Sequence, residues 1–314
     1  MMKSLYSKQW DGRNSKKWDG RMQHETVLAV SNLKKRYGLI EAVAEANITV
    51  HASEVVCLVG PNGSGKTTLI ECIEGLRNAD AGQITLFGRS SGSRRQRAHL
   101  IGVQLQEEGL PARIRVGEAV RLFAAIYGVQ TPDDELIEQL GLTELVRRPF
   151  EMLSGGQKRR TALALAFIHD PRLAILDEPS SGLDPQGQRE IISIIKQRAN
   201  AGTGLLITTH NMQFAAEVAD RVVTIRNGRT IANDTPDKLL ASLPYTWCLS
   251  GPVDLKLPEG HPGYLLCEHN NYRLYGDRPE LERILDTLNP TDQVRMNLRR
   301  VDLSDALFLY ESKD

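Results

Sequence analysis

Residues 60–67, GPNGSGKT, combine glycines, a lysine and a threonine at spacings suited to binding phosphate. Gly60 and Gly65 would let backbone N–H groups curl around the phosphates, Lys66 would neutralise their charge, and the Thr67 hydroxyl would face Mg²⁺. A buried apolar run at 54–60 precedes this loop, and apolar residues at helical spacing follow it. The strand, glycine loop and helix favour a nucleotide-binding loop over its alternative, a glycine-rich turn without a ligand.

Two carboxylates and a histidine end two later apolar runs. Asp177 and Glu178 come at the end of the run within 172–179, and His210 ends the run at 203–210. Open α/β sheets place ligand sites at the carboxyl ends of their strands. Beside a phosphate loop, we expect Asp177 to hold Mg²⁺, Glu178 to polarise the attacking water, and His210 to reach the γ-phosphate. The alternatives are a helix cap or surface pair for the carboxylates and a core histidine for His210.

Residues 153–160, LSGGQKRR, open a basic helix with a serine, two glycines and a glutamine. A helix start of this kind suits an anion, because its first N–H groups are unpaired and its dipole is positive there. The chain would thus carry two phosphate-binding segments. We expect the second segment to serve a phosphate held by another molecule.

Composition limits the classes of function. The 314 residues suggest one large and one smaller domain, and a net charge of zero with a pI near 7.1 gives no reason to expect nucleic acid as a partner. The four cysteines lack the spacing of a zinc site or a disulfide scaffold, so we expect reduced thiols and a cytosolic protein. No apolar run approaches the roughly 20 residues that span a bilayer, and we expect no signal peptide.

The chain is predicted to have three parts. Residues 1–25 carry an octapeptide written twice, at 7–14 and 15–22, and indicate a flexible arm, either dispensable or in contact with a partner through its tryptophans. Residues 26–240 form an α/β core with a helical insertion at about 107–170. Residues 241–314 form a small α+β domain, in which no catalytic constellation is visible.

In this order, the motifs resemble the nucleotide-binding subunit of an ATP-binding cassette (ABC) transporter. They are Walker A at 60–67, a Q-loop glutamine, the signature LSGGQ at 153–157, Walker B at 173–179, the D-loop SGLD at 181–184 and a switch histidine. The resemblance covers residues 26–240. It implies an α/β fold: a P-loop NTPase core with an antiparallel β subdomain, a helical insertion and a small C-terminal α+β domain.

The resemblance also assigns roles to individual residues. Tyr37 in KKRYG would stack on adenine. Gln106 in VQLQEE would be the Q-loop residue and a Mg²⁺ ligand with Thr67 and Asp177, although Gln104 lies nearby. Asp184 would belong to the D-loop. The remaining ATP contacts implied for the Walker A loop and its helix are Asn62, Gly63, Ser64 and Thr68.

The same resemblance answers the question of the second phosphate-binding segment. Two cassettes in this family face head to tail, so the signature loop of one receives the γ-phosphate of ATP bound by the other. The residues implied in this trans contact are Ser154, Gly155, Gly156 and Gln157. The implied cofactors are ATP and Mg²⁺, and the second cassette would be a copy of this chain or a paralogue.

The implied function is ATP hydrolysis that powers transport through a separate multi-span membrane subunit, at the cytoplasmic face of the cell membrane. The C-terminal DLSDALFL and the stretch LFAAIYG at 122–128 resemble cassettes of bacterial drug and antibiotic exporters, so we favour export. The alternatives are an importer cassette and a soluble ABC ATPase of the DNA-repair or translation type. One departure from the family is that VHASEVV lacks the glycine often found before the Walker A strand.

Overall fold

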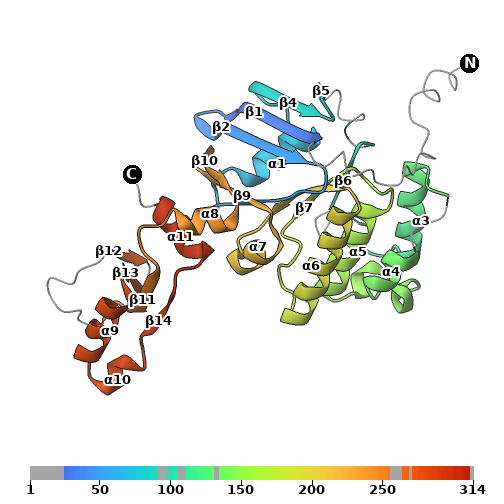
Figure 1. Ribbon diagram of the computed structural model, residues 1–314. Coiled ribbons are helices and arrows are strands. Elements are labelled where there is room, and N and C mark those ends of the chain that lie inside the picture. The colour runs from blue at the N-terminus through green and yellow to red at the C-terminus, as the bar shows by residue number, and fades with distance from the viewer. Residues whose placement is uncertain are drawn as a thin grey trace, which may run out of the picture. The chain divides into compact units, whose positions relative to one another are not determined.

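The structure is a computed structural model that describes residues 25–90, 97, 99–104, 110–130, 134–254, 264–268 and 271–311. The chain divides into two compact units, residues 1–233 and 234–314. The first unit contains a ten-stranded sheet in the order β5-β4-β1-β2-β10-β9-β3-β8-β7-β6, and the second contains a four-stranded sheet (Figure 1). The duplicated octapeptide lies outside the described residues.

One half of the large sheet is parallel and carries the functional strand ends. All five residues of β3 and of β8 are buried, because helices cover both faces of such a sheet. The neighbouring strands pair in register, with Leu58 opposite Thr208 and Asp177 opposite Thr208. These strands are β6 (Ile101–Val103), β7 (Leu173–Asp177), β8 (Gly204–Thr208), β3 (Val55–Val59) and β9 (Arg221–Arg226).

The other half of the sheet is antiparallel. It consists of β5 (Arg89–Ser90), β4 (Ala81–Leu86), β1 (Thr26–Tyr37) and β2 (Ile40–His51), and β10 (Arg229–Asp234) joins it to the parallel half. The turn from β2 into β3 contains Ser53 at φ 62°, a left-handed conformation that favours glycine. Serine therefore adopts the backbone geometry for which the family often uses glycine.

Helices flank the sheet and fill the segment between β6 and β7 (Figure 1). That segment contains α3 (Val116–Tyr127), α4 (Asp134–Gln139), the 3₁₀ turns Thr143–Leu145 and Phe150–Met152, and α5 (Gly155–Phe167). The helices outside it are α1 (Lys66–Glu74), α6 (Pro185–Asn200) and α7 (Met212–Val218). In the described part of the chain, no helix is long and apolar enough to cross a membrane.

Helix α5 packs directly against strand β6. A Cβ added at Gly102 would lie 2.1 Å from the carbonyl oxygen of Ala166 and 2.7 Å from Cγ of Pro171. No side chain fits between the strand and the helix backbone at this point. The glycine is therefore required by the close approach of the two elements.

The second unit is a small antiparallel sheet with helices. Its strands follow the order β12-β13-β11-β14, and one face packs on α9 through Leu249, Leu274, Leu281 and Ile284. The strands are β11 (Trp247–Pro252), β12 (Tyr264–Glu268), β13 (Asn271–Gly276) and β14 (Asn297–Arg300). The helices are α8 (Pro236–Ala241), α9 (Arg278–Thr287), α10 (Pro290–Gln293) and α11 (Leu303–Glu311).

The fold class predicted from the sequence is confirmed: the first unit is a mixed α/β cassette, and the second is a small α+β sheet. The last strand of the second unit, β14, comprises only Asn297–Arg300. Asn289 caps a helical turn with Pro290 in its first position, so strand pairing begins only at Asn297.

Candidate nucleotide site

The glycine loop between β3 and α1 is held in a conformation that only glycine allows. Gly60 has φ 151° and Gly65 has φ 105°. A Cβ at Gly60 would lie 2.1 Å from the carbonyl oxygen of Ile225, and one at Gly65 would lie 2.3 Å from the carbonyl oxygen of Ala42. The neighbouring strands thus fix the loop, and any side chain at either glycine would displace it.

The start of α1 has the features of an anion site. Gly65 is its N-cap and supplies no side-chain hydrogen bond, and the first turn contains no acidic residue. The ammonium of Lys66 donates to the carbonyl oxygens of Gly60 (2.8 Å) and Pro61 (2.9 Å), which keeps it over the loop. Thr67 is exposed in the first turn. Backbone N–H groups, a cation and a hydroxyl therefore meet here.

The predicted carboxylates and histidine lie at the ends of β7 and β8. Thr208 donates its hydroxyl proton to the Asp177 carboxylate, and the backbone N–H of Glu178 donates to Thr208 Oγ1 (3.2 Å) and to its carbonyl oxygen (3.1 Å). Glu178 has φ 48°, which turns the chain sharply after the strand. These contacts tie the two acidic residues to the neighbouring strand.

His210 contacts Glu178. The distance from His210 Nδ1 to Glu178 Oε1 is 2.8 Å, while Glu178 Oε2 is buried without a hydrogen-bond partner. The His210 side chain is 65% exposed, so this residue is not a core histidine. The structure brings Glu178 and His210 together, as their positions at adjacent strand ends suggested.

Gln106, which the resemblance implies as the Q-loop residue, lies outside the described residues. Gln104, two positions earlier, is buried and donates from Nε2 to the carbonyl oxygen of Asp177 (3.3 Å). Its Oε1 is buried with no hydrogen-bond partner. Gln104 therefore anchors the end of β7 from β6, a contact that the sequence alone did not reveal.

The signature loop caps its own helix. Ser154 Oγ accepts from the N–H of Gln157 (3.3 Å), and Gln157 Oε1 accepts from the N–H of Ser154 (3.1 Å), which together form a capping box. Asp184 caps α6 in a similar way, accepting from the N–H of Gly187 (2.7 Å). A Cβ at Gly156 would lie 3.0 Å from Leu183, so the signature and D-loop segments pack closely.

Tyr37 ends β1 with a ring that is accessible and flanked by cations. Its exposed fraction is 39%, and Lys35 Nζ and the Arg77 guanidinium lie 5.5 and 5.9 Å from the ring centroid. A partly exposed aromatic face can stack on a base. The geometry of Tyr37 is therefore compatible with contact to adenine.

Glu74 is an acidic residue near this site that the motifs did not indicate. Burial, with added repulsion from Asp177 and Glu71, raises its pKa to about 7. No group of three or more His, Cys, Asp or Glu side chains suited to a metal is found among the described residues. A magnesium ion needs no such cage, because it commonly takes one or two carboxylates together with phosphates and water.

Comparisons with known proteins agree with this geometry. Residues 43–181 match the family model described as ABC transporter. The chain is 32% identical over 283 residues to the Nod factor export ATP-binding protein I of Rhizobium etli, covering 88% of this chain and 87% of that protein. It is 35% identical over 231 residues to the phosphonates import ATP-binding protein PhnC of Hyphomonas neptunium, covering 68% and 88%.

A solved structure of an ATP-binding subunit of an ABC transporter is also similar. Its TM-score is 0.64 with 28% identity, and the match covers 69% of this chain and 92% of the other. The similarity therefore extends to both sequence and fold. Relatives named for export and for import both occur, so these names do not decide the direction of transport.

Proposed function

We propose, from the premise that this chain belongs to the ATP-binding subunits of ABC transporters, that it hydrolyses ATP to drive export through a separate membrane subunit. The observation that best supports hydrolysis is the environment of the Glu178 carboxylate. One carboxylate oxygen contacts His210, and the other is buried without a hydrogen-bond partner just after β7, in the parallel half of the sheet that also contains β3. A carboxylate held in this way can accept a proton from an attacking water.

We assign one group of these residues to nucleotide binding and another to hydrolysis. Lys66 and the backbone N–H groups of the loop, with Asn62, Gly63, Ser64 and Thr68, bind the phosphates, and Tyr37 stacks on adenine. Glu178 orients and deprotonates the water, and His210 holds Glu178 and hydrogen-bonds the γ-phosphate. The contact of His210 with Glu178 and the position of Lys66 over the loop support the roles of these three residues, and the family resemblance supports the other assignments.

The donor set also fits Mg²⁺. The Thr67 hydroxyl and the Asp177 carboxylate would supply oxygen atoms, which are the ligands this ion prefers, and the resemblance implies Gln106 as a further ligand. Bound there, the ion would neutralise charge on the phosphates. Asp177 is positioned for this role by the hydroxyl of Thr208.

The second half of the composite site comes from another cassette. Ser154, Gly155, Gly156 and Gln157 form the exposed start of α5, and we assign them to the γ-phosphate of ATP bound by a second copy or a paralogue. Asp184 belongs to the same interface. The membrane subunit would place the assembly at the cytoplasmic face of the cell membrane.

The extent of one alignment favours export over import. The match to the Nod factor exporter covers 88% of the 314 residues, which is more than the 233 residues of the first unit. It therefore extends into the second unit. The match to the phosphonates importer covers 68% of the chain. Similarity that includes the second unit supports an exporter-type cassette.

Substitution of Ser154 by arginine tests the proposal. Ser154→Arg places a bulky cation where the γ-phosphate should meet the second cassette. We expect ATP binding to the isolated chain to persist, while ATP-driven dimerisation and hydrolysis are lost. Ser31→Arg, at an exposed position of β1, is the matched control and should retain both.

Purification from detergent-solubilised membranes tests the transport role. The wild-type chain should recover a multi-span membrane protein, and cells with Ser154→Arg should lose export of its substrate. Recovery of no such protein, together with unaffected transport in the variant, would favour a soluble ABC ATPase. Substrate uptake instead of efflux in the recovered system would identify an importer.

A further inference from the structure

One face of the sheet in the second unit is divided into an apolar and a polar part. Residues directly opposite in an antiparallel pair lie on the same face. Cys248 is opposite Tyr275, and both pack with Leu309 of α11. Further along β11, Ser250 is opposite both Arg273 and Asn297. Helix α11 therefore contacts the apolar part, and the polar part begins at Ser250.

The polar part forms an open cavity of about 550 Å³. Its wall includes three guanidinium groups and three neutral hydrogen-bonding side chains, and no acidic side chain of the described residues lines it. These six residues are Ser250, Asn271, Arg273, Arg295, Asn297 and Arg299. The volume lies within the range of sites for small molecules.

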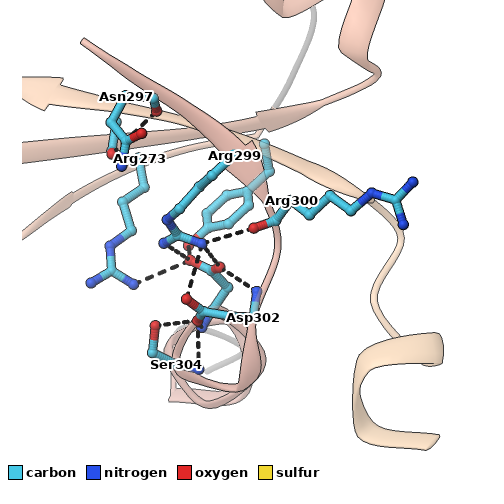
Figure 2. Close-up of polar contacts among 9 residues, drawn as sticks. Arg273, Asn297, Arg299, Arg300, Asp302 and Ser304 are labelled. Carbon is cyan, nitrogen blue, oxygen red and sulfur yellow. Dashed lines mark hydrogen bonds and ion pairs between the residues drawn. The ribbon is translucent and has the colours of Figure 1, made fainter. Parts of the chain in front are cut away.

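Two of the arginines are held by a carboxylate behind the cavity. Asp305 of α11 is fully buried, and its Oδ1 accepts from Arg299 Nη2 (3.0 Å), Arg273 Nη1 (3.3 Å) and the Tyr275 hydroxyl (3.0 Å). Arg299 Nη1 also donates to Asp305 Oδ2. Figure 2 shows Arg273 of β13 and Arg299 of β14 converging from the two strands that flank β11, whereas Arg300 extends away from them. Arg273 and Arg299 are therefore oriented before any ligand binds.

The third arginine approaches from the end of the sheet. Arg295 is 44% exposed and donates from Nη2 to both carboxylate oxygens of Asp254 (2.9 and 2.8 Å). The aspartates that contact the three arginines, including Asp302 beside Arg299, do not line the cavity. The negative charges thus lie behind or beside the cavity, and the cations face into it.

We propose that this arginine cavity binds a small molecule with two or more carboxylate or phosphate groups. A guanidinium presents several N–H donors in a planar fork that matches these groups, and it stays charged at any physiological pH. Three such forks on one wall suit more than one anionic group. Ser250, Asn271 and Asn297 can bond the neutral oxygens of the same ligand. The cavity lies within the second unit and is independent of the ATPase proposal.

The test is calorimetric titration of the full chain with citrate and, separately, with pyrophosphate. The buffer contains no divalent cation, nucleotide or chelator, because ADP and EDTA are themselves polyanions of the proposed class and would compete for the cavity. Wild type should bind at least one probe. Arg295→Gln should weaken that binding about tenfold or more, because a charge-assisted hydrogen bond is lost.

Two further variants separate recognition from folding. Arg273→Lys keeps the charge but loses the planar fork, so its affinity should fall while its thermal unfolding stays close to wild type. Arg300→Gln makes the same charge change as Arg295→Gln. Because Arg300 follows Arg299 on β14 and its side chain extends away from Arg273 and Arg299, this variant should bind the probe as wild type does. Equal weakening in Arg300→Gln would show a general charge effect and overturn the proposal.

Two other outcomes would also overturn it. The first is no heat of binding for either probe at millimolar concentration. The second is cosedimentation with vesicles containing phosphatidylglycerol, lost in Arg295→Gln, without binding of the free anions, which would identify a lipid surface. Citrate binding alone would identify a carboxylate ligand, and pyrophosphate binding alone a phosphate ligand, and each supports the proposal.

Discussion

Each of the two units contains a carboxyl group withdrawn from solvent, partly for Glu74 and fully for Asp305, and the charges around the two groups differ in sign. Glu74 in the first unit has its pKa raised to about 7 by burial, and the nearby charges of Asp177 and Glu71 add to the effect. Burial would also raise the pKa of Asp305 in the second unit. There, hydrogen bonds from Arg299 and from the Asp302 N–H, with the charge of Arg299, outweigh burial and lower it.

This difference separates a region arranged for chemistry from one arranged for stability. In the first unit, acidic residues gather near the phosphate loop at a cost in folding free energy. Such unfavourable placement is typical of functional sites. In the second unit, the carboxylate is compensated by arginines and in turn orients them. Substitution of Glu74 and of Asp305 should therefore change the free energy of unfolding in opposite directions, and substitution of Glu178 should change activity.

The largest effect is expected for Glu178→Gln. Turnover of ATP should fall by about 10²–10⁴-fold, because glutamine cannot accept the proton of the attacking water. The free energy of unfolding and ATP affinity should stay near wild type, and the ATP-bound dimer should persist. Steady-state phosphate release, urea unfolding and light scattering with Mg-ATP measure these properties.

Glu217→Gln is the control for that substitution, because Glu217 is exposed on α7 and makes the same charge change. Its turnover should match wild type. Near-normal turnover in Glu178→Gln would show that Glu178 does not accept the proton of the attacking water. The first unit would then lack the catalytic carboxylate that distinguishes it from the second.

Asp305→Asn should instead destabilise the second unit by about 3–5 kcal/mol, because it removes the fully buried carboxylate charge that Arg273 and Arg299 contact. ATP affinity should not change. The pKa of Asp305 is lowered, so its stabilising effect is present above its unfolded pKa and is lost as pH falls through the folded pKa. The difference between wild type and variant should therefore shrink in acid.

Urea unfolding measures this loss in a background with Trp10→Phe and Trp18→Phe, which leaves Trp247 of β11 as the single tryptophan. Asp286→Asn, at an exposed position of α9, is the control and should unfold as the parent does. An unchanged midpoint in Asp305→Asn would show that the arginines do not depend on this carboxylate.

Glu74→Gln should show the smallest effect and the opposite sign. A carboxyl group with a raised pKa loses stability as pH rises from its unfolded value of 4.5 toward about 7. The variant should therefore be more stable than wild type by about 2–3 kcal/mol at pH 8, and nearly equal to it at pH 5. Urea unfolding at both pH values, without nucleotide or divalent cation, measures the difference.

Glu144→Gln, in an exposed 3₁₀ turn, should give the same small difference at both pH values. A Glu74→Gln variant that is less stable than wild type at pH 8 would contradict the environment described for Glu74. It would also remove the contrast with Asp305.

The phosphate loop and strand ends were predictable because each depends on a short continuous segment. GPNGSGKT specifies its own turn, and Asp177, Glu178 and His210 directly follow buried strands. Gln104 and Glu74 were not predictable, because their surroundings come from distant segments. Gln104 donates a hydrogen bond to the carbonyl oxygen of Asp177 at the end of β7, and the charge of Asp177 helps to raise the pKa of Glu74.

The arginine cavity was not predictable for a related reason. Its residues come from three strands and from Arg295 before β14, and the common face of the strand residues depends on the pairing of Ser250 with Arg273 and Asn297. A shift of one residue in either pairing would turn the side chains to the other face. No short sequence motif predicts the register in which β11 pairs with β13 and β14.

The close contact at Gly102 has a mechanical consequence. Helix α5, about 20 Å long at 1.5 Å per residue, begins beside Ser154 and rests near its other end on β6 without an intervening side chain. No layer of side chains that could be compressed separates this end of α5 from β6. A push on its first turn would therefore be transmitted to the strand that leads toward Gln106, with little displacement absorbed along the way.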